Sequence, residues 1–253
     1  MCVFYLSIHQ YESSAHSPIL AKTISNESWN IMNGITKMKL ILIKPEAVER
    51  GGAYRFSDQI INGLRTEKEL SVVGFGNAIA LTCMAVQVSS NIANVSIREL
   101  SLDYIGAPAL QIGGVIVILD KERVVDWNQK KKALDEKMKL DFSREGQIIV
   151  ISQKLSADQV VPLSLSKLAR SELLKITATG TAINRATLLA LELTKGNIAK
   201  ECVGIELVTL STVEFRKESR VEQITGIEIY LRKGIQTAYT PKHKEVLKML
   251  EQK

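Results

Sequence analysis

The chain has 253 residues, of which 45% are hydrophobic and 24% are charged, and its formal net charge is +6. This composition is typical of a globular protein and excludes a collagen-like or low-complexity chain. Because no apolar run approaches the roughly 20 residues of a membrane-spanning helix, we expect no membrane partner. Cys2, Cys83 and Cys202 lie far apart, which excludes a disulfide scaffold or a cysteine-based zinc site and favours a reducing compartment, nuclear or cytoplasmic. Cys83 and Cys202 are expected to be buried as small apolar residues.

Residues 1–37 are predicted to form a disordered tail. The sequence MCVFYL is apolar for only six residues and has no basic segment before it, so it does not match a secretory signal. Lys22 is the only basic residue among residues 1–36, whereas transit peptides are rich in Arg. The rest of this segment is polar and aperiodic, and we expect a protein that is not secreted.

The excess positive charge belongs to the C-terminal part of the chain. Residues 39–121 contain eight basic and eight acidic residues, whereas residues 147–253 contain sixteen basic and eleven acidic residues. A local basic surface attracts polyanions more strongly than the same charge spread evenly. The surplus is modest, so it is compatible with a nucleic-acid partner and also with an ordinary solvated surface.

Two segments of the chain resemble each other. ELSVVGFGNAIALT at 69–82 aligns with LKITATGTAINRAT at 174–187, which places Gly76 on Gly180 with an offset of 104 residues. GGVIVILDK at 113–121 aligns with TGIEIYLRK at 225–233 with an offset of 112 residues, so the second copy has eight more residues between the two matches. This pattern predicts two copies of one unit of about 85–90 residues.

Each copy has the same order of predicted elements. Short β-branched runs, KLILIK at 39–44 and QIIVIS at 147–152, predict opening strands. A helix with apolar residues at helical spacing, a strand ending in glycine, a second helix and two further strands follow in both copies. The fold class is therefore α+β, with a βαβαββ domain at 38–122 and another at 147–234. A helical linker at 123–146 and a C-terminal helix at 235–253 complete the chain.

The second copy contains GTAINRA at Gly180–Ala186 and ends in IEIYLRK at Ile227–Lys233. Both sequences resemble motifs of the Alba superfamily of small nucleic-acid-binding proteins, and the first copy keeps GNAI at Gly76–Ile79 and the last-strand pattern. Among two-copy relatives, the chain is similar to the Alba-like macronuclear-development proteins of ciliates. The resemblance implies two tandem Alba-like domains packed as an intramolecular pseudo-dimer.

The glycine motif also has a physical meaning. A glycine between a strand and a helix permits a tight turn, and the start of the helix presents free N–H groups and a positive dipole end that suit a phosphate. Thr179 and Thr181 stand where Alba-like proteins often have basic residues, so hydroxyl and amide donors are expected to replace some phosphate contacts. The alternative is that these residues form only a turn and core contacts. The nucleic-acid-binding residues predicted here are Lys154, Gly180, Thr181, Asn184 and Arg185.

Part of the extra length of the second copy is expected in the hairpin STVEFRKESRVEQITG. In the Alba superfamily this hairpin is an arm that reaches along nucleic acid. The resemblance therefore implies phosphate contacts from its basic residues and stacking of its aromatic residue on a base. The glutamates between them leave open a hairpin whose charges pair with one another. The predicted binding residues of the hairpin are Phe215, Arg216, Lys217 and Arg220.

The segments outside the two copies are predicted to be polar. Apolar residues from Trp127 to Met138 have helical spacing in the linker. Lys130–Lys132 on this helix form either a phosphate-facing patch or a solvated face. His243 lies among lysines near the C-terminus, where we expect it to be solvated.

The sequence has no paired carboxylates, phosphate-binding lysine motif or nucleophile elbow, so we expect no enzyme, no cofactor and no metal site. Sequence and resemblance together favour a non-enzymatic protein that binds RNA or DNA through the second domain and its hairpin. RNA is favoured because the resemblance extends to eukaryotic relatives found in ribonucleoprotein particles. The alternative is a pseudo-dimeric scaffold subunit with protein partners in a ribonucleoprotein or chromatin complex, which the modest charge favours.

Overall fold

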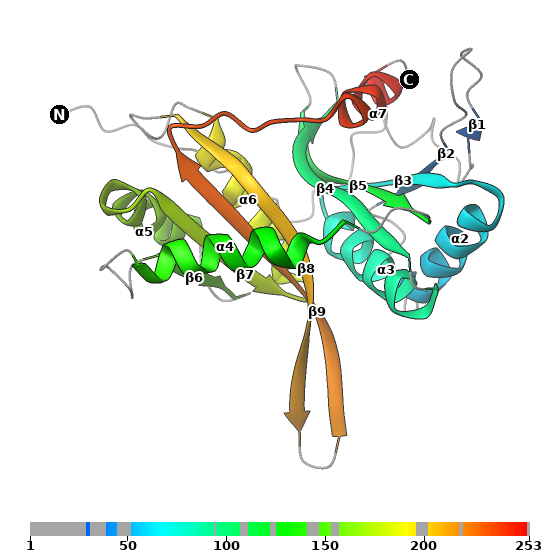
Figure 1. Cartoon of the computed structure of the whole chain (residues 1–253), viewed down its shortest axis with the longest axis horizontal. Helices are drawn as coiled ribbons and strands as arrows, with labels where there is room; N and C mark the ends of the chain where they lie inside the picture. The colour runs from blue at the N-terminus through cyan, green and yellow to red at the C-terminus, as the bar shows by residue number, and fades with distance from the viewer. Residues whose placement is uncertain are drawn as a thin grey trace.

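The computed structural model of the chain describes residues 29–30, 39–44, 52–93, 95–106, 111–121, 125–140, 147–152, 157–195, 202–217 and 220–251. Most of the predicted tail and the candidate residue Lys154 lie outside these ranges. Figure 1 shows the described helices and strands with the labels used below.

The first unit is a mixed sheet with two helices on one face. Its strands lie in the order β2-β3-β5-β4, with β2 parallel to β3 and the other pairs antiparallel. The strands are rich in β-branched residues, as in IGGVIVILD of β5, which pack well on a pleated sheet. The elements are β2 (Lys39–Ile43), α2 (Gly52–Thr66), β3 (Glu69–Phe75), α3 (Ala78–Ala93), β4 (Ser96–Ile105) and β5 (Ile112–Asp120).

The second unit repeats this topology, with the strand order β6-β7-β9-β8. Its opening strand β6 is parallel to β7, and the remaining pairs are antiparallel. This element order confirms the α+β class and the two βαβαββ units predicted from the sequence. The elements are β6 (Ile148–Ile151), α5 (Ala157–Arg170), β7 (Leu173–Thr179), α6 (Ala182–Thr194), β8 (Val203–Lys217) and β9 (Arg220–Lys233).

The strand registers show where the eight extra residues of the second copy lie. Asp120 pairs with Ser96, and the equivalent Arg232 pairs with Gly204. β8 is therefore offset from β4 by 108 residues, midway between the two offsets of 104 and 112 seen in the sequence. Four of the extra residues precede β8 and four lengthen the β8–β9 hairpin. The expectation that part of the extra length lies in the hairpin is confirmed.

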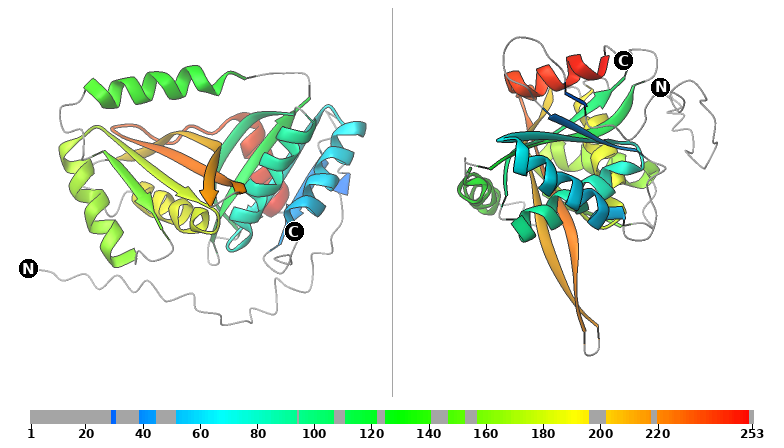
Figure 2. Two further views of the ribbon diagram at one scale, coloured as in Figure 1. Left: turned by 90° about the horizontal axis from the view of Figure 1, so that it is seen from below. Right: turned by 90° about the vertical axis from the view of Figure 1, so that its right-hand side faces the viewer.

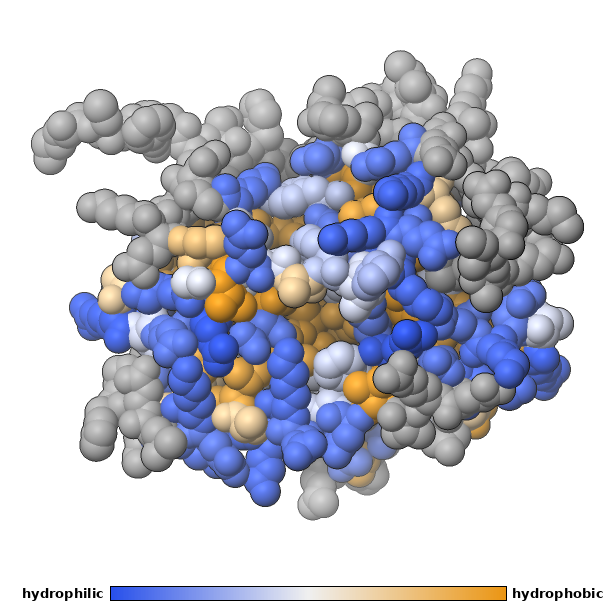
Figure 3. Space-filling view, turned by 45° about the horizontal axis from the view of Figure 1, so that its top comes forward, coloured by the Kyte–Doolittle hydropathy of each residue, from blue (hydrophilic) through white to orange (hydrophobic). Residues whose placement is uncertain are grey.

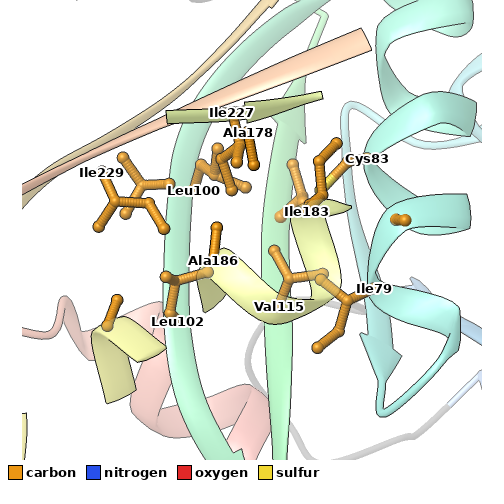
Figure 4. Packing of buried hydrophobic residues seen from close by; sticks show 14 of the residues in the cluster. Ile79, Cys83, Leu100, Leu102, Val115, Ala178, Ile183, Ala186, Ile227 and Ile229 are labelled. Carbon is orange, nitrogen blue, oxygen red and sulfur yellow. The ribbon is translucent and has the colours of Figure 1, made fainter. Parts of the chain in front are cut away.

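One hydrophobic core joins the two units. Figure 4 shows Ile79 and Cys83 of α3 close to Ile183 and Ala186 of α6, and all four are fully buried. Strand residues of both sheets, such as Val115, belong to the same core. Because full burial of a side chain the size of Ile contributes about 1.5–3 kcal/mol, this shared core stabilises the contact between the units.

The contacts between the units are reciprocal. α3 packs against β8 and β9, α6 packs against β4 and β5, and β4 contacts β8. Leu188 of α6 lies so close to Gly113 of β5 that a Cβ at that glycine would come within 2.6 Å of the Leu188 Cδ2 atom. The Tyr104 hydroxyl of β4 donates a hydrogen bond of 2.7 Å to Glu192 of α6. The helix after the motif glycine, α3 in the first unit and α6 in the second, therefore packs on the hairpin strands of the other unit.

Each sheet has an outer face, on the side away from the two helices of its own unit. That face is covered by the helix that comes after the other unit in the chain. α4 (Trp127–Leu140) follows the first unit and lies across the strands of the second sheet, opposite α5 and α6 (Figures 1 and 2). α7 (Pro241–Glu251) follows the second unit and packs on the first sheet. Beneath α4 the apolar cluster contains Trp127, Leu134, Met138, Leu173, Leu207 and Tyr230. Beneath α7 the buried cluster contains Leu40, Val73, Ile105, Ile116 and Val246.

A short strand precedes the first unit. β1 (Trp29–Asn30) pairs antiparallel with β2, with Trp29 opposite Leu40 and Asn30 opposite Lys39. The prediction of a disordered tail is wrong for these two residues. The physical reason is that β2 is an outer strand of the core sheet, whose unpaired backbone groups accept a further strand whatever its hydrophobic pattern.

His243 is fully buried, so the expectation that it is solvated is wrong. Its Nδ1 lies 2.6 Å from Oγ of Ser101 and its Nε2 lies 2.9 Å from Oδ2 of Asp103. The ring stacks on Tyr239 at 4.2 Å between centroids. The neighbouring lysines wrongly indicated an exposed position. α7 packs one face against β4, and His243 lies on that face.

The two described cysteines differ in environment. Cys83 is buried, as predicted, and its burial raises the pKa of its thiol to about 12. Cys202 is exposed, contrary to the prediction, because it precedes β8 instead of lying within it. Its Sγ donates a hydrogen bond of 3.2 Å to the backbone oxygen of Ile235.

Candidate functional site

The two motif glycines form the same turn. Gly76 and Gly180 each have a φ of +56°, a left-handed conformation that residues with a side chain rarely adopt. The Gly76 N–H donates to the oxygen of Gly113, and the Gly180 N–H donates to the oxygen of Thr225, both at 2.9 Å. Each turn is thus fixed to the last strand of its own unit.

Asn184 connects the second motif helix to the first. Its Oδ1 accepts a hydrogen bond of 2.7 Å from the Ala80 N–H, and its Nδ2 donates one of 3.3 Å to the oxygen of Asn77. Ala80 is the third residue of α3, where an N–H has no intrahelical acceptor. Asn184 therefore caps the first motif helix from the second unit. The amide of this predicted binding residue is used in the contact between the units.

Thr181 and Arg185 lie at the start of α6 and are exposed. Thr181 is the N-cap residue, and its side chain makes no capping hydrogen bond. The N–H groups of Ile183 and Asn184 bond back to Gly180 and Thr181 at 3.2 and 3.3 Å. Gly180 and Thr181 therefore lie directly before α6, and Asn184 and Arg185 lie in its first turn. Thr181 and Arg185 are exposed.

β8 and β9 continue as a two-stranded ribbon that projects from the body of the protein (Figure 1). We call its last four strand pairs the arm. The hairpin of the first unit ends at the pair Ile105–Ile112, which is equivalent to Val213–Ile224 in the second unit. Among the residues that the structure describes, the first unit therefore has no counterpart of the arm. The arm consists of the pairs Glu214–Gln223, Phe215–Glu222, Arg216–Val221 and Lys217–Arg220.

The register of the arm separates its acidic from its basic residues. Glu214 lies opposite Gln223, whose amide donates to Oε1 at 3.4 Å, and Glu222 lies opposite Phe215. Lys217 and Arg220 lie opposite each other. Directly opposite residues interact most closely across strands, and in this register neither Glu214 nor Glu222 lies directly opposite a basic residue of the arm. Glu222 is diagonal to Lys217.

Each face of the arm presents one exposed apolar side chain. Phe215 is 45% exposed and Val221 is 58% exposed. They belong to neighbouring strand pairs, and successive positions along a strand point to opposite faces. Phe215 is therefore accessible from one side of the arm and Val221 from the other.

The root of the arm is held by both units. Gln87 of α3 donates a hydrogen bond of 3.2 Å to the hydroxyl of Thr212. Thr212 pairs with Thr225, whose oxygen accepts the hydrogen bond from the Gly180 turn. The tip lies five residues farther along the strands, about 17 Å at the usual strand rise. The predicted residues at the turn and in the arm therefore belong to one side of the second unit.

Two lysines of the linker helix are paired within the chain. Lys130 Nζ donates to the backbone oxygen of Glu206 at 2.9 Å and lies 3.7 Å from its carboxylate. Lys131 Nζ lies 2.5 Å from the carboxylate of Glu228. Lys132 is exposed. Of the two alternatives for Lys130–Lys132, a continuous phosphate-facing patch is the less favoured, because two of its three charges contact the second sheet.

A buried polar cluster lies beneath α4. Lys175 Nζ is 3.1 Å from Asp135, 3.2 Å from Glu228 and 4.9 Å from the centroid of the Tyr230 ring. The Tyr230 hydroxyl donates to Asp135 at 2.9 Å, and burial together with this hydrogen bond raises the pKa of Tyr230. These contacts hold α4 on the sheet, and each charged group among them already has a partner of opposite sign.

Within the described ranges, no group of three or more His, Cys, Asp or Glu side chains is arranged to bind a metal ion. None of the helices described is long and apolar enough to cross a membrane. Figure 3 shows hydrophilic residues over most of one face, with hydrophobic residues visible between them near its middle.

No protein-family model matches the chain, and no curated protein matches it either. The chain is similar to the solved structure of Alba from Thermoplasma volcanium. The two are 23% identical, the alignment covers 34% of this chain and 99% of that chain, and the TM-score is 0.30. The fold given above rests on element order and strand register alone.

The sequence did not single out three residues of the candidate site. Gln87 and Thr212 meet across the two units at the root of the arm, and nothing in their local sequence indicates a contact between residues so far apart. Val221 had a usable signal, since it is an apolar residue between charged neighbours at a predicted hairpin tip.

Proposed function

We propose that the chain is a non-enzymatic protein that binds the phosphate backbone of nucleic acid, with the arm as its main contact. The observation that supports this most is the arm itself. It projects from the body, has basic residues at three of its eight strand positions, and has no acidic residue opposite them in register. The segment 214–223 contains three basic and three acidic residues. Basic side chains on a projecting ribbon follow phosphates and gain affinity by displacing their counterions.

We favour single-stranded RNA over duplex DNA as the ligand. The exposed ring of Phe215 offers a surface on which an unpaired base stacks, and such bases are common in single-stranded RNA. Bases in a DNA duplex are already stacked on one another. The turn residues Thr181 and Arg185, and Lys154 beyond the described ranges, are proposed to add phosphate contacts at the root of the arm.

In this proposal the chain is an intramolecular pseudo-dimer of Alba-like domains and a member of that superfamily. The reciprocal packing of α3 and α6 on the hairpin strands of the opposite unit supports it. The hydrogen bond between Asn184 and Ala80 supports it further. The first unit then positions the arm through Gln87 and contributes less to ligand contact.

A scaffold subunit of a ribonucleoprotein or chromatin assembly is the second candidate, and such an assembly places the protein in the nucleus or the cytoplasm. It is favoured by the ion pairs that occupy Lys130, Lys131, Lys175 and Arg232. These pairs reduce the basic charge available to a polyanion outside the arm.

The experiment that separates the two candidates is a filter-binding titration of the full chain with single-stranded RNA and with duplex DNA at several salt concentrations. Nucleic-acid binding through phosphates predicts that the logarithm of affinity falls linearly with the logarithm of salt concentration, with RNA bound more tightly. Absence of binding to both nucleic acids at low salt would leave the scaffold as the better candidate.

A further inference from the structure

β6 is an open edge of the second sheet. Among the described residues it pairs with β7 alone. The Lys175 N–H of β7 donates to the oxygen of Gln147 at 2.8 Å. In a parallel pair of strands, every second residue points both its N–H and its C=O group toward the neighbouring strand. Ile149 therefore bonds to β7. The N–H and C=O groups of Ile148 and Val150 point away from β7, toward the open edge. Such unpaired groups are a template for another strand.

The side chains along this edge are apolar and exposed. Ile148 is 48% exposed and Val150 is 67% exposed. Natural edge strands are usually protected by lysine, proline or a bulge, but β6 consists of IIVI, and its register with β7 is continuous. The apolar cluster beneath α4 includes residues of β7, β8 and β9 and no residue of β6.

The first unit shows what the equivalent edge accepts. Leu40 of β2 corresponds to Ile148 of β6, and it is only 2% exposed. β1 pairs with Leu40 in antiparallel orientation, and α7 packs over its side chain. This edge of the unit is therefore compatible with an added antiparallel strand and an apolar cover, and β6 has neither within the described ranges.

We propose that β6 pairs antiparallel with β6 of a second copy of this chain. Centred on Ile149, this pairing sets Ile148 opposite Val150 of the second copy, and Val150 opposite Ile148 of the second copy. Opposite residues of this kind exchange both backbone hydrogen bonds. Their side chains all lie on the outer face, where they contact one another across the strands.

A second copy fits this edge better than an unrelated strand for two reasons. Ile148 and Val150 are alternate residues of the strand, so their backbone groups point to the same edge, and both side chains are apolar. The strand is therefore complementary to a second copy of itself about a two-fold axis. β6 also has no charged residue that would repel its own copy. A four-residue strand buries less area than a standard stable interface, so the association is weak and depends on protein concentration.

The test is sedimentation equilibrium of the full chain without nucleic acid, over a thousandfold range of protein concentration. The unmodified chain is expected to pass from monomer to dimer. Val150→Lys is expected to weaken dimerisation at least tenfold, because it places a charge in the apolar contact. Ile92→Lys changes an apolar residue of α3, in the first unit, that is 64% exposed, and it should leave dimerisation unchanged.

A second variant guards against misfolding of the first. Ile148→Pro removes an outward N–H without removing a hydrogen bond to β7, a position where edge strands tolerate proline. It should also abolish the dimer while circular dichroism shows an unchanged fold. A chain that stays monomeric at every concentration overturns the proposal, and so does a dimer that survives both edge variants. Because no nucleic acid is present, either result is independent of the proposed function.

Discussion

Asn184 and Ala80 occupy the same position in the two repeats, and the side chain of the first accepts a hydrogen bond of 2.7 Å from the backbone of the second. Residues at equivalent positions of two related units meet only close to the axis that relates them. The contact therefore lies where α3 and α6 pack around a common centre. Because one position is Asn and the other is Ala, a single asparagine serves both helices, a division of roles that two identical subunits could not make.

The first prediction concerns this contact. Asn184→Ala leaves the Ala80 N–H and the Asn77 oxygen without their partner, so the free energy of unfolding should fall by about 1–3 kcal/mol. Urea unfolding followed by circular dichroism measures the change. Asn62→Ala makes the same chemical change at an exposed position of α2 and should stay within about 0.5 kcal/mol of the parent. Equal effects of the two variants would mean that the contact does not stabilise the fold.

The second prediction concerns the basic residues of the arm. Replacing Arg216, Lys217 and Arg220 together by Gln should weaken binding to all nucleic-acid sequences alike. It should also reduce the slope of log affinity against log salt by about 2–3, since each phosphate contact contributes roughly 0.7–0.9. The filter-binding titration described above measures both quantities.

The control for this triple variant changes three basic residues of the first unit, Lys44, Arg55 and Arg65, to Gln. The described part of the first unit has no counterpart of the arm, so this control should affect binding less. If the arm variant keeps both its affinity and its salt slope while remaining folded, the arm is structural and the scaffold becomes the better interpretation.

The third prediction concerns Phe215. Phe215→Ala should cost about 1–3 kcal/mol of binding free energy with single-stranded RNA, the range for loss of one stacked base. Duplex DNA offers no unstacked base, so its binding should change little. Val221→Ala, on the opposite face of the arm, serves as the matched control in the same titration. An equal loss with RNA and duplex DNA would contradict stacking as the role of the ring.

The fourth prediction concerns the buried histidine. His243→Ala removes the partner of Ser101 and Asp103 and leaves a cavity between α7 and β4, so the free energy of unfolding should fall by about 2–4 kcal/mol. Thermal and urea unfolding measure it, with Lys244→Ala on the exposed side of α7 as control. A change below about 0.5 kcal/mol would show that α7 adds little to the stability of the first unit.

The fifth prediction concerns thiol reactivity. Burial raises the pKa of the Cys83 thiol to about 12. At pH 8 this thiol is therefore almost entirely protonated and unreactive, and it is also inaccessible to reagents. Iodoacetamide should therefore modify Cys202 in the folded protein and modify Cys83 only after unfolding. Mass spectrometry of the digested protein assigns each site. Comparable rates at the two cysteines in the native state would show that the core around Cys83 opens readily.

Much of the fold followed from local patterns in the sequence. The alignment of Gly76 with Gly180 and the difference between the two offsets located both repeats and the longer hairpin, because periodicity and turn residues are properties of neighbouring positions. Strand-ending glycines could be read in the same way, since the left-handed turn that they form needs no partner from elsewhere in the chain.

The tertiary structure alone decided how residues far apart in the chain meet. The sequence could not indicate that α4 covers the second sheet and α7 the first, that His243 is buried against β4, or that Asn184 caps the helix of the other unit. Each of these contacts joins residues separated by many tens of positions, and each depends on how helices cross and how sheets are stacked. Hydrophobic periodicity fixes which face of a helix is buried, but the surface that buries it is chosen by the packing of the whole chain.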